Sequence, residues 1–180
     1  MRWRASRLKL WLLDADVIIK LLEIDVFDKL VAMHDLHVAS TVVDEVKYYR
    51  RAGQKYQVNF RQQYIDSGRV TETTATTEEM QEVLHRLPSL RQQGIHAGEI
   101  ESLAVLVRQE DLTLCTFDAA AIRSLPFLDV TDRAVSAERL LQTSGLTLSP
   151  GYKLDPRLTE AYFRSNIDHG VQEFICSPRR

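Results

Sequence analysis

The sequence has few of the features that define several large protein classes. It has two cysteines, Cys115 and Cys176, in 180 residues, too few for a disulfide framework or a four-ligand zinc site. It contains no internal repeat, no long block of charge of one sign and no apolar run near the roughly 18 residues that a membrane span needs. The hydrophobic fraction of 44% is that of a globular protein. We therefore expect one folded domain that does not enter a membrane.

The N-terminal segment is basic, but it does not have the pattern of a signal peptide. Its apolar stretch is interrupted at Asp14 and Asp16, and no small-residue cleavage site follows. The formal net charge of the chain is −2, so the whole molecule is not a general polyanion binder. These features predict a cytoplasmic location.

Short apolar runs alternate with amphipathic stretches along most of the chain. The runs predict strands at residues 8–13, 36–39, 69–72, 112–116 and 127–130. The 3.6-residue periodicity predicts helices at 17–22, 26–31, from 42 onward, 55–66, 98–108, around 122, 137–142 and 155–168. Alternating strands and helices favour an α/β fold with a parallel sheet covered by helices on both faces.

Two further features concern the organisation of the chain. The turn-rich stretch 144–151 predicts a boundary between a domain at 1–144 and a C-terminal helical extension at 145–180, which packs on the domain or on a partner. Thr41 with Asp44, and Thr76 with Glu79, have the spacing of a helix-capping box. We therefore interpret Asp44 mainly as a capping residue and Glu45 as the better candidate ligand.

Acidic residues recur where predicted strands end or helices begin: Asp14 and Asp16, Glu45, Glu99, and Asp118. Because ligands of parallel sheets bind outside the carboxyl ends of the strands, these residues are candidates for one site. Clustered carboxylates repel one another unless a cation neutralises them, and oxygen ligands suit Mg²⁺ or Mn²⁺. Such ions assist hydrolysis of phosphodiesters. Glu101 lies about 200° around its helix from Glu99, so only one of the two is expected to face the site.

Four segments resemble the motifs of one family, the PIN-domain ribonucleases, which include VapC-type toxins. Residues 12–19 (LLDADVII) are similar to the family's first strand and its aspartate, and residues 39–46 (ASTVVDEV) to its second motif. Residues 96–104 (HAGEIESLA) resemble the third motif, and residues 114–118 (LCTFD) the fourth. The resemblance covers about residues 8–143.

The resemblance implies a five-stranded parallel sheet and one or two Mg²⁺ or Mn²⁺ ions held by Asp14, Glu45, Glu99 and Asp118, with Thr116 assisting through its hydroxyl. It implies cleavage of single-stranded RNA that leaves a 3′-hydroxyl and a 5′-phosphate. It also implies two kinds of protein partner, a cognate antitoxin protein and a second copy of the chain in a homodimer.

The segment 47–69 is the strongest candidate for RNA contacts outside the acidic site. It holds six basic residues against one acidic residue. Of these, Arg50, Arg51 and Lys55 are the expected phosphate contacts. Tyr56, Phe60 and Tyr64 follow at intervals of four, which is typical either of a helix face packed on the core or of a base-stacking surface.

The sequence is also compatible with two other functions. Ala119 stands where many family members have a second acid, which motivates a non-catalytic PIN-fold RNA-binding or interaction module. Asp14-Ala15-Asp16 also resembles the opening motif of haloacid-dehalogenase-type phosphatases, in which the first aspartate is a covalent nucleophile. Metal-independent RNA binding without cleavage would indicate the module, and a transient aspartyl-phosphate would indicate the phosphatase.

Overall fold

The fold is built on a five-stranded, all-parallel sheet with the strand order β5-β2-β1-β6-β7. The computed structural model describes residues 10–148 and 151–177. The predicted first strand is confirmed from Leu10, whereas Leu8 and Lys9 lie outside the described residues. The expected α/β class and parallel sheet are therefore present.

The elements have the following bounds. The strands are β1 (Leu10–Leu13), β2 (Asp35–Ala39), β3 (Tyr48–Arg51), β4 (Gln54–Gln57), β5 (Thr71–Thr73), β6 (Leu112–Cys115) and β7 (Ala134–Val135). The α-helices are α1 (Ala15–Glu23), α2 (Phe27–Met33), α3 (Ser40–Glu45), α4 (Thr77–Arg86), α5 (Ser89–Gln92), α6 (Ala97–Arg108), α7 (Ala119–Leu128), α8 (Ala137–Thr143) and α9 (Glu160–Cys176).

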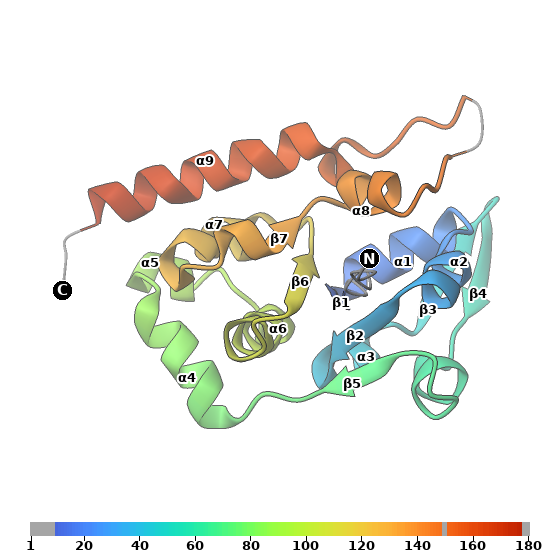
Figure 1. The fold of residues 1–180 in the computed structure, drawn as a ribbon, viewed down its shortest axis with the longest axis horizontal. Coiled ribbons are helices and arrows are strands. Elements are labelled where there is room, and N and C mark those ends of the chain that lie inside the picture. Colours follow the sequence, from blue (N-terminus) through green and yellow to red (C-terminus); the bar gives the residue numbers. More distant parts are fainter. Residues whose placement is uncertain (1–9, 149–150, 178–180) are drawn as a thin grey trace, which may run out of the picture.

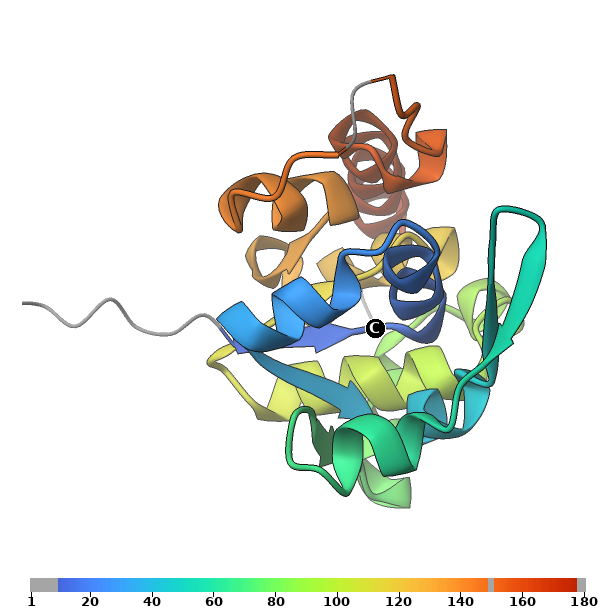
Figure 2. The same ribbon diagram turned by 90° about the vertical axis from the view of Figure 1, so that its right-hand side faces the viewer.

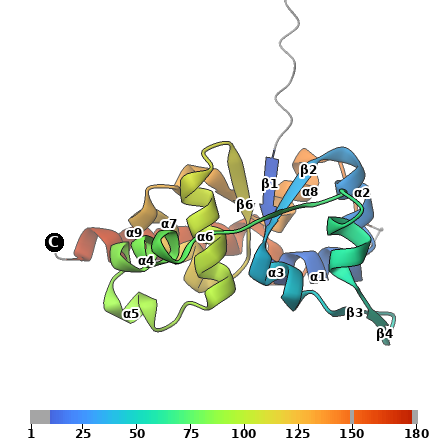
Figure 3. The same cartoon turned by 90° about the horizontal axis from the view of Figure 1, so that it is seen from below.

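The alternation of side chains along the central strands divides the core into two layers. Trp11 and Leu13 of β1 pack with residues of α1, α2 and α8, whereas Leu12 packs on the other face with residues of α4, α6 and α7. Because successive side chains of a strand point to opposite faces, each central strand serves both layers. Figures 1 and 3 show the helices on the two sides of the sheet.

The helix predicted at 55–66 is wrong over its first part. Residues 48–57 form the antiparallel hairpin β3–β4, and a π-helical turn follows at Arg61–Ile65. The hairpin stands out from the rest of the molecule at one end (Figures 1 and 2). Its turn places Ala52 and Gly53 at φ of 50° and 78°. Positive φ at both turn residues is what a two-residue hairpin loop requires.

The expected strand at 127–130 is also wrong. Phe127 and Leu128 form the last turn of α7, which ends at Asp129 in the left-handed conformation (φ 58°). The last strand is β7, which pairs with β6 through Ala134 and Val135. Phe127 and Leu128 are buried in the core as part of this helix. A short apolar run is equally compatible with a buried strand and with a buried helix, so the hydrophobicity of this segment does not distinguish between them.

The C-terminal extension packs on the domain through α9, which runs along α7 (Figure 1). The predicted helix at 155–168 instead spans Glu160–Cys176. At Gly170 a β-carbon would lie 2.6 Å from the backbone oxygen of Arg123, so the two helices meet where one lacks a side chain. Phe163 and Ile167 of α9 join the same buried cluster as α7.

Within residues 10–148 and 151–177, no helix is both long enough and apolar enough to cross a bilayer.

Candidate functional site

Several of the predicted site residues lie at the carboxyl edge of the sheet, in the segments that follow strands β1, β2 and β6. Asp14 follows β1, Glu45 ends the helix after β2, and Thr116 and Asp118 follow β6. Helix α6 leads back to the start of β6, so its first turn, which holds Glu99, lies at the same edge. The parallel topology thus brings the predicted residues to one side of the molecule.

Asp14 is the buried centre of this group, with 9% of its surface exposed. It caps α1, and its Oδ1 accepts a hydrogen bond from the Ala15 N–H at 2.8 Å. Its Oδ2 accepts from the Thr116 hydroxyl at 3.0 Å. The Thr116 hydroxyl oxygen in turn accepts from the Asp118 N–H at 3.1 Å. This chain fixes the Asp14 carboxylate and links the ends of β1 and β6.

Burial raises the pKa of Asp14 to about 6, against the lowering effect of its hydrogen bonds, and the charges of Asp16 and Asp118 contribute to the rise. Burial also raises the pKa of Glu99 to about 7, and the charges of Asp118 and Asp14 raise it further. Asp14 and Asp118 therefore lie near enough to Glu99 for their charges to act on its carboxyl group.

Glu45 lies against the start of α6, close to Gly98. A β-carbon on Gly98 would be 3.0 Å from Glu45 Oε1, so the absence of a side chain at Gly98 makes room for this carboxylate. Partial burial and the charge of Asp16 raise the pKa of Glu45, and His96 lowers it. Asp16 therefore lies near both Asp14 and Glu45, and it is the acidic residue that the predicted ligand set omitted.

Glu101 is excluded from this site by its contacts. It is 5% exposed, and its carboxylate accepts from the Thr41 N–H at 2.8 Å and from the Thr41 hydroxyl, and from the Ala75 N–H at 3.3 Å. The predicted capping of Thr41 by Asp44 is therefore wrong: Ala39 is the N-cap of α3, and the Thr41 hydroxyl bonds to Glu101 instead. Thr76 and Glu79, by contrast, form the predicted capping box.

We expect Glu101→Gln to destabilise the fold by about 1–3 kcal/mol, because an amide NH₂ would face a backbone N–H and leave a buried donor unpaired. Urea unfolding measures this change. Glu82→Gln, on the exposed side of α4, is the matched control and should alter stability by less than about 0.5 kcal/mol. Equal effects of the two substitutions would contradict a structural role for Glu101.

The donor set suits a hard divalent cation in its chemistry, since it consists of carboxylate oxygens. In the part of the chain that the structure describes, no three acidic, histidine or cysteine side chains come close enough to hold an ion. Besides Asp14, which accepts from the Ala15 N–H, two more of the carboxylates accept hydrogen bonds from backbone N–H groups. Glu99 accepts from His96 at 2.7 Å, and Asp118 accepts from Ala121 at 2.8 Å. A bound cation would compete with these helix-start hydrogen bonds.

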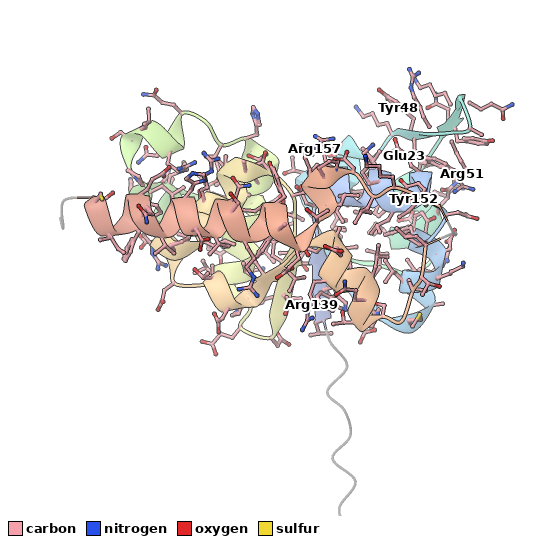
Figure 4. The ribbon with its side chains drawn as sticks, turned by 90° about the horizontal axis from the view of Figure 1, so that it is seen from above. Glu23, Tyr48, Arg51, Arg139, Tyr152 and Arg157 are labelled. Atoms are coloured by element: carbon pink, nitrogen blue, oxygen red, sulfur yellow. The ribbon has the colours of Figure 1, made fainter. Side chains whose placement is uncertain are left out.

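The predicted RNA contacts lie on the two faces of the β3–β4 hairpin. Arg50 and Lys55 are directly opposite each other on the exposed face, and the Lys55 ammonium lies 3.8 Å from the centroid of the Tyr48 ring. Arg51 is on the other face, where it donates to the Leu22 carbonyl at 2.6 Å and pairs with Asp25 at 3.0 Å. Figure 4 shows Tyr48 and Arg51 on opposite sides of the hairpin. Arg51 thus attaches the hairpin to α1.

The aromatic residues spaced by four do not share a surface. Tyr56 stacks on Tyr49 across the hairpin, with ring centroids 5.1 Å apart. Phe60 and Tyr64 are buried and contact each other and Phe27 in the core. Their spacing reflects two separate structures, a cross-strand pair and a core cluster.

Comparison of the chain with protein-family models, with curated proteins and with solved structures gave no match.

Proposed function

We propose that the protein is a divalent-cation-dependent ribonuclease of the PIN-domain type. The observation that carries the proposal is the convergence of Asp14, Glu99 and Asp118 at the carboxyl edge of a parallel sheet, with raised pKa values at Asp14 and Glu99. Four sequence motifs, in the family's order, supply the residues of this edge. The parallel five-stranded sheet agrees with the layout that the motifs imply.

In this proposal Asp14, Glu45, Glu99 and Asp118 would hold Mg²⁺ or Mn²⁺, and to do so they would have to come closer together than they lie in the described structure. The cation would lower the pKa of a water molecule and neutralise charge that develops on the phosphoryl group. Thr116 orients Asp14 through its 3.0 Å hydrogen bond. In the reaction, a water oxygen forms a bond to phosphorus and the bond to the 3′-oxygen breaks. The products are a 3′-hydroxyl, which gains a proton, and a 5′-phosphate.

Incubation of an end-labelled RNA pool with Mn²⁺, with Mg²⁺ or with EDTA tests this function. We expect cleavage with either cation, no cleavage with EDTA, and products that carry a 5′-phosphate. Absence of cleavage by folded protein in the presence of both cations would contradict the proposal.

A non-catalytic RNA-binding module is the second candidate. It is favoured by the hydrogen bonds of Glu99 and Asp118 to backbone N–H groups, which occupy oxygens that a cation would need, and by the absence of any three potential ligands close enough to hold an ion among the described residues. RNA binding that is unchanged by EDTA, together with the absence of cleavage, would establish it. The cognate antitoxin and the homodimer belong to the PIN-type proposal, and copurification and light scattering test them.

Whether the protein is a ribonuclease or a non-catalytic module, we expect the RNA strand to bind the exposed face of the β3–β4 hairpin. Arg50 and Lys55 are exposed, and no ion pair engages them among the described residues. We expect the double variant Arg50→Ala/Lys55→Ala to bind single-stranded RNA about tenfold more weakly, at roughly 0.7 kcal/mol for each exposed contact. The slope of log K against log salt should fall in magnitude by about 1.4. Fluorescence anisotropy of a labelled oligonucleotide measures both quantities.

The control for this prediction is the double variant Lys29→Ala/Arg86→Ala, which removes the same charge from exposed positions on α2 and α4. Its affinity and salt slope should equal those of the wild type. If the two double variants behave alike, the hairpin is not the binding surface.

A further inference from the structure

The C-terminal extension returns to the acidic site through a short turn at Pro156–Leu158. Leu158 is 2% exposed and packs in the same buried cluster as Phe117, so it anchors this turn on the domain. Beside it, the Arg157 guanidinium lies over the Phe117 ring, 5.1 Å from its centroid. Phe117 stands between Thr116 and Asp118 in the chain, so Arg157 is adjacent to the strand end that carries the site. Figure 4 shows Arg157 where the extension passes close to α1.

The guanidinium is held in one orientation. Asp155 accepts hydrogen bonds from its Nε at 3.3 Å and from its Nη2 at 3.0 Å, and also from the Arg157 backbone N–H at 3.0 Å. The described residues offer no hydrogen-bond partner to Nη1. One edge of the planar group is therefore fixed by Asp155, and the other edge keeps donors for a ligand.

Arg157 also shares an electrostatic environment with the site. Its hydrogen bonds to Asp155 raise its pKa, and the charge of Asp16 raises it further. Asp16 likewise contributes to the raised pKa values of Asp14 and Glu45. A single acidic residue of α1 thus lies within range of both the carboxylate group and the arginine.

A site built from carboxylates repels the polyanionic backbone of RNA, so a cation at its rim would favour productive binding. Arg157 forms an ion pair with Asp155, but that contact uses only Nε and Nη2 of its guanidinium. We propose that Arg157 binds a backbone phosphate of the RNA strand and positions it at the acidic site. This inference rests on the proposed function and adds a residue from the extension to the site.

The test measures RNA binding and RNA cleavage separately for Arg157→Ala. Binding of a short labelled single-stranded RNA of mixed sequence is measured by anisotropy in EDTA over a range of salt concentrations. We expect the salt slope to fall in magnitude by about 0.7, the value for one phosphate contact on a single strand. With Mn²⁺ we expect kcat/KM for cleavage to fall by about 10- to 100-fold, as for the loss of a charge-assisted hydrogen bond.

Two further variants separate contact from structure. Arg164→Ala removes an arginine from the same extension, at a side chain that is 73% exposed, and should change neither quantity. Arg157→Lys keeps the charge but loses the planar fork, so it should retain the salt slope and recover only part of kcat/KM. Thermal unfolding of each variant shows whether the turn at Pro156–Leu158 remains docked.

The outcomes distinguish this inference from the proposed function. Cleavage by the wild type together with an unchanged salt slope and kcat/KM in Arg157→Ala would overturn the inference and leave the ribonuclease standing. A reduced slope without any cleavage by the wild type would support the phosphate contact and overturn the ribonuclease. Absence of both RNA binding and cleavage in the wild type would overturn both.

Discussion

Asp14→Asn is expected to lower the rate of metal-dependent RNA cleavage by about 1000-fold or more. The substitution removes one negative ligand from the proposed cation site, and such a cation supplies several kcal/mol of transition-state stabilisation. Asparagine has nearly the same shape, and its side-chain oxygen can still accept from the Ala15 N–H. The loss should therefore appear in activity and not in the fold, and kcat/KM with circular dichroism measures the two.

Asp44→Asn is the matched control, since Asp44 is an exposed residue one position from Glu45. It should retain most of the activity. Equal losses of activity in the two variants would show that the choice of Glu45 over Asp44 as the cation ligand from α3 is wrong. Full activity of Asp14→Asn would show that Asp14 is not a ligand in the proposed site.

The second large effect concerns stability and pH. The pKa of Asp14 is raised from 3.8 to about 6 in the folded protein. The unfolded chain therefore loses this proton first as the pH rises, and the folded state becomes less stable between about pH 4 and pH 7. The shift corresponds to roughly 3 kcal/mol at pH values above 7 in the absence of a cation. Glu99, with a pKa raised to about 7, acts in the same direction.

Other carboxylates of the protein, such as Glu72 and Asp155, have lowered pKa values and act in the opposite direction. The measurement is therefore the difference in unfolding free energy between the wild type and Asp14→Asn, in EDTA, at several pH values. We expect the wild type to lose stability relative to the variant as the pH rises from 4 to 7. A difference that stays constant with pH would contradict the raised pKa of Asp14.

A divalent cation should reverse this loss, because it binds the deprotonated carboxylates of the folded state. At a free Mn²⁺ concentration 100 times its Kd, the wild type should gain about 2.7 kcal/mol above pH 7. Asp14→Asn should gain much less. This result would support the cation site without any assay of cleavage.

Local sequence patterns were sufficient where the structure depends on local burial or local capping. The apolar runs that became β1, β2 and β6 were recognisable because a central parallel strand is buried on both faces. The capping box of Thr76 and Glu79 was recognisable because both partners lie within one turn. The positions of Asp14 and Asp118 followed from the strand ends.

The remaining features depend on contacts that a local helical or strand pattern does not predict, most of them between residues far apart in the chain. Thr41 was assigned to Asp44, but Glu101, sixty residues away, offers two carboxylate oxygens to the start of α3 and to Ala75. The spacing of Tyr56 and Phe60 imitates a helix, whereas the cross-strand stacking of Tyr56 on Tyr49 stabilises a hairpin. Arg157 gave no local signal, because the turn that carries it reaches Phe117 only in the folded chain.

The position of β1 in the sheet has a consequence for the synthesis of the protein. β1 is the first strand of the described chain but lies in the middle of the sheet, between β2 and β6. Its partner β6 is roughly 100 residues further on, so at ribosomal rates of about 5–20 residues per second one edge of β1 stays unpaired for about 5–20 s. Trp11, Leu12 and Leu13 are then available to other chains. We therefore expect the nascent chain to expose an apolar strand that the folded protein buries.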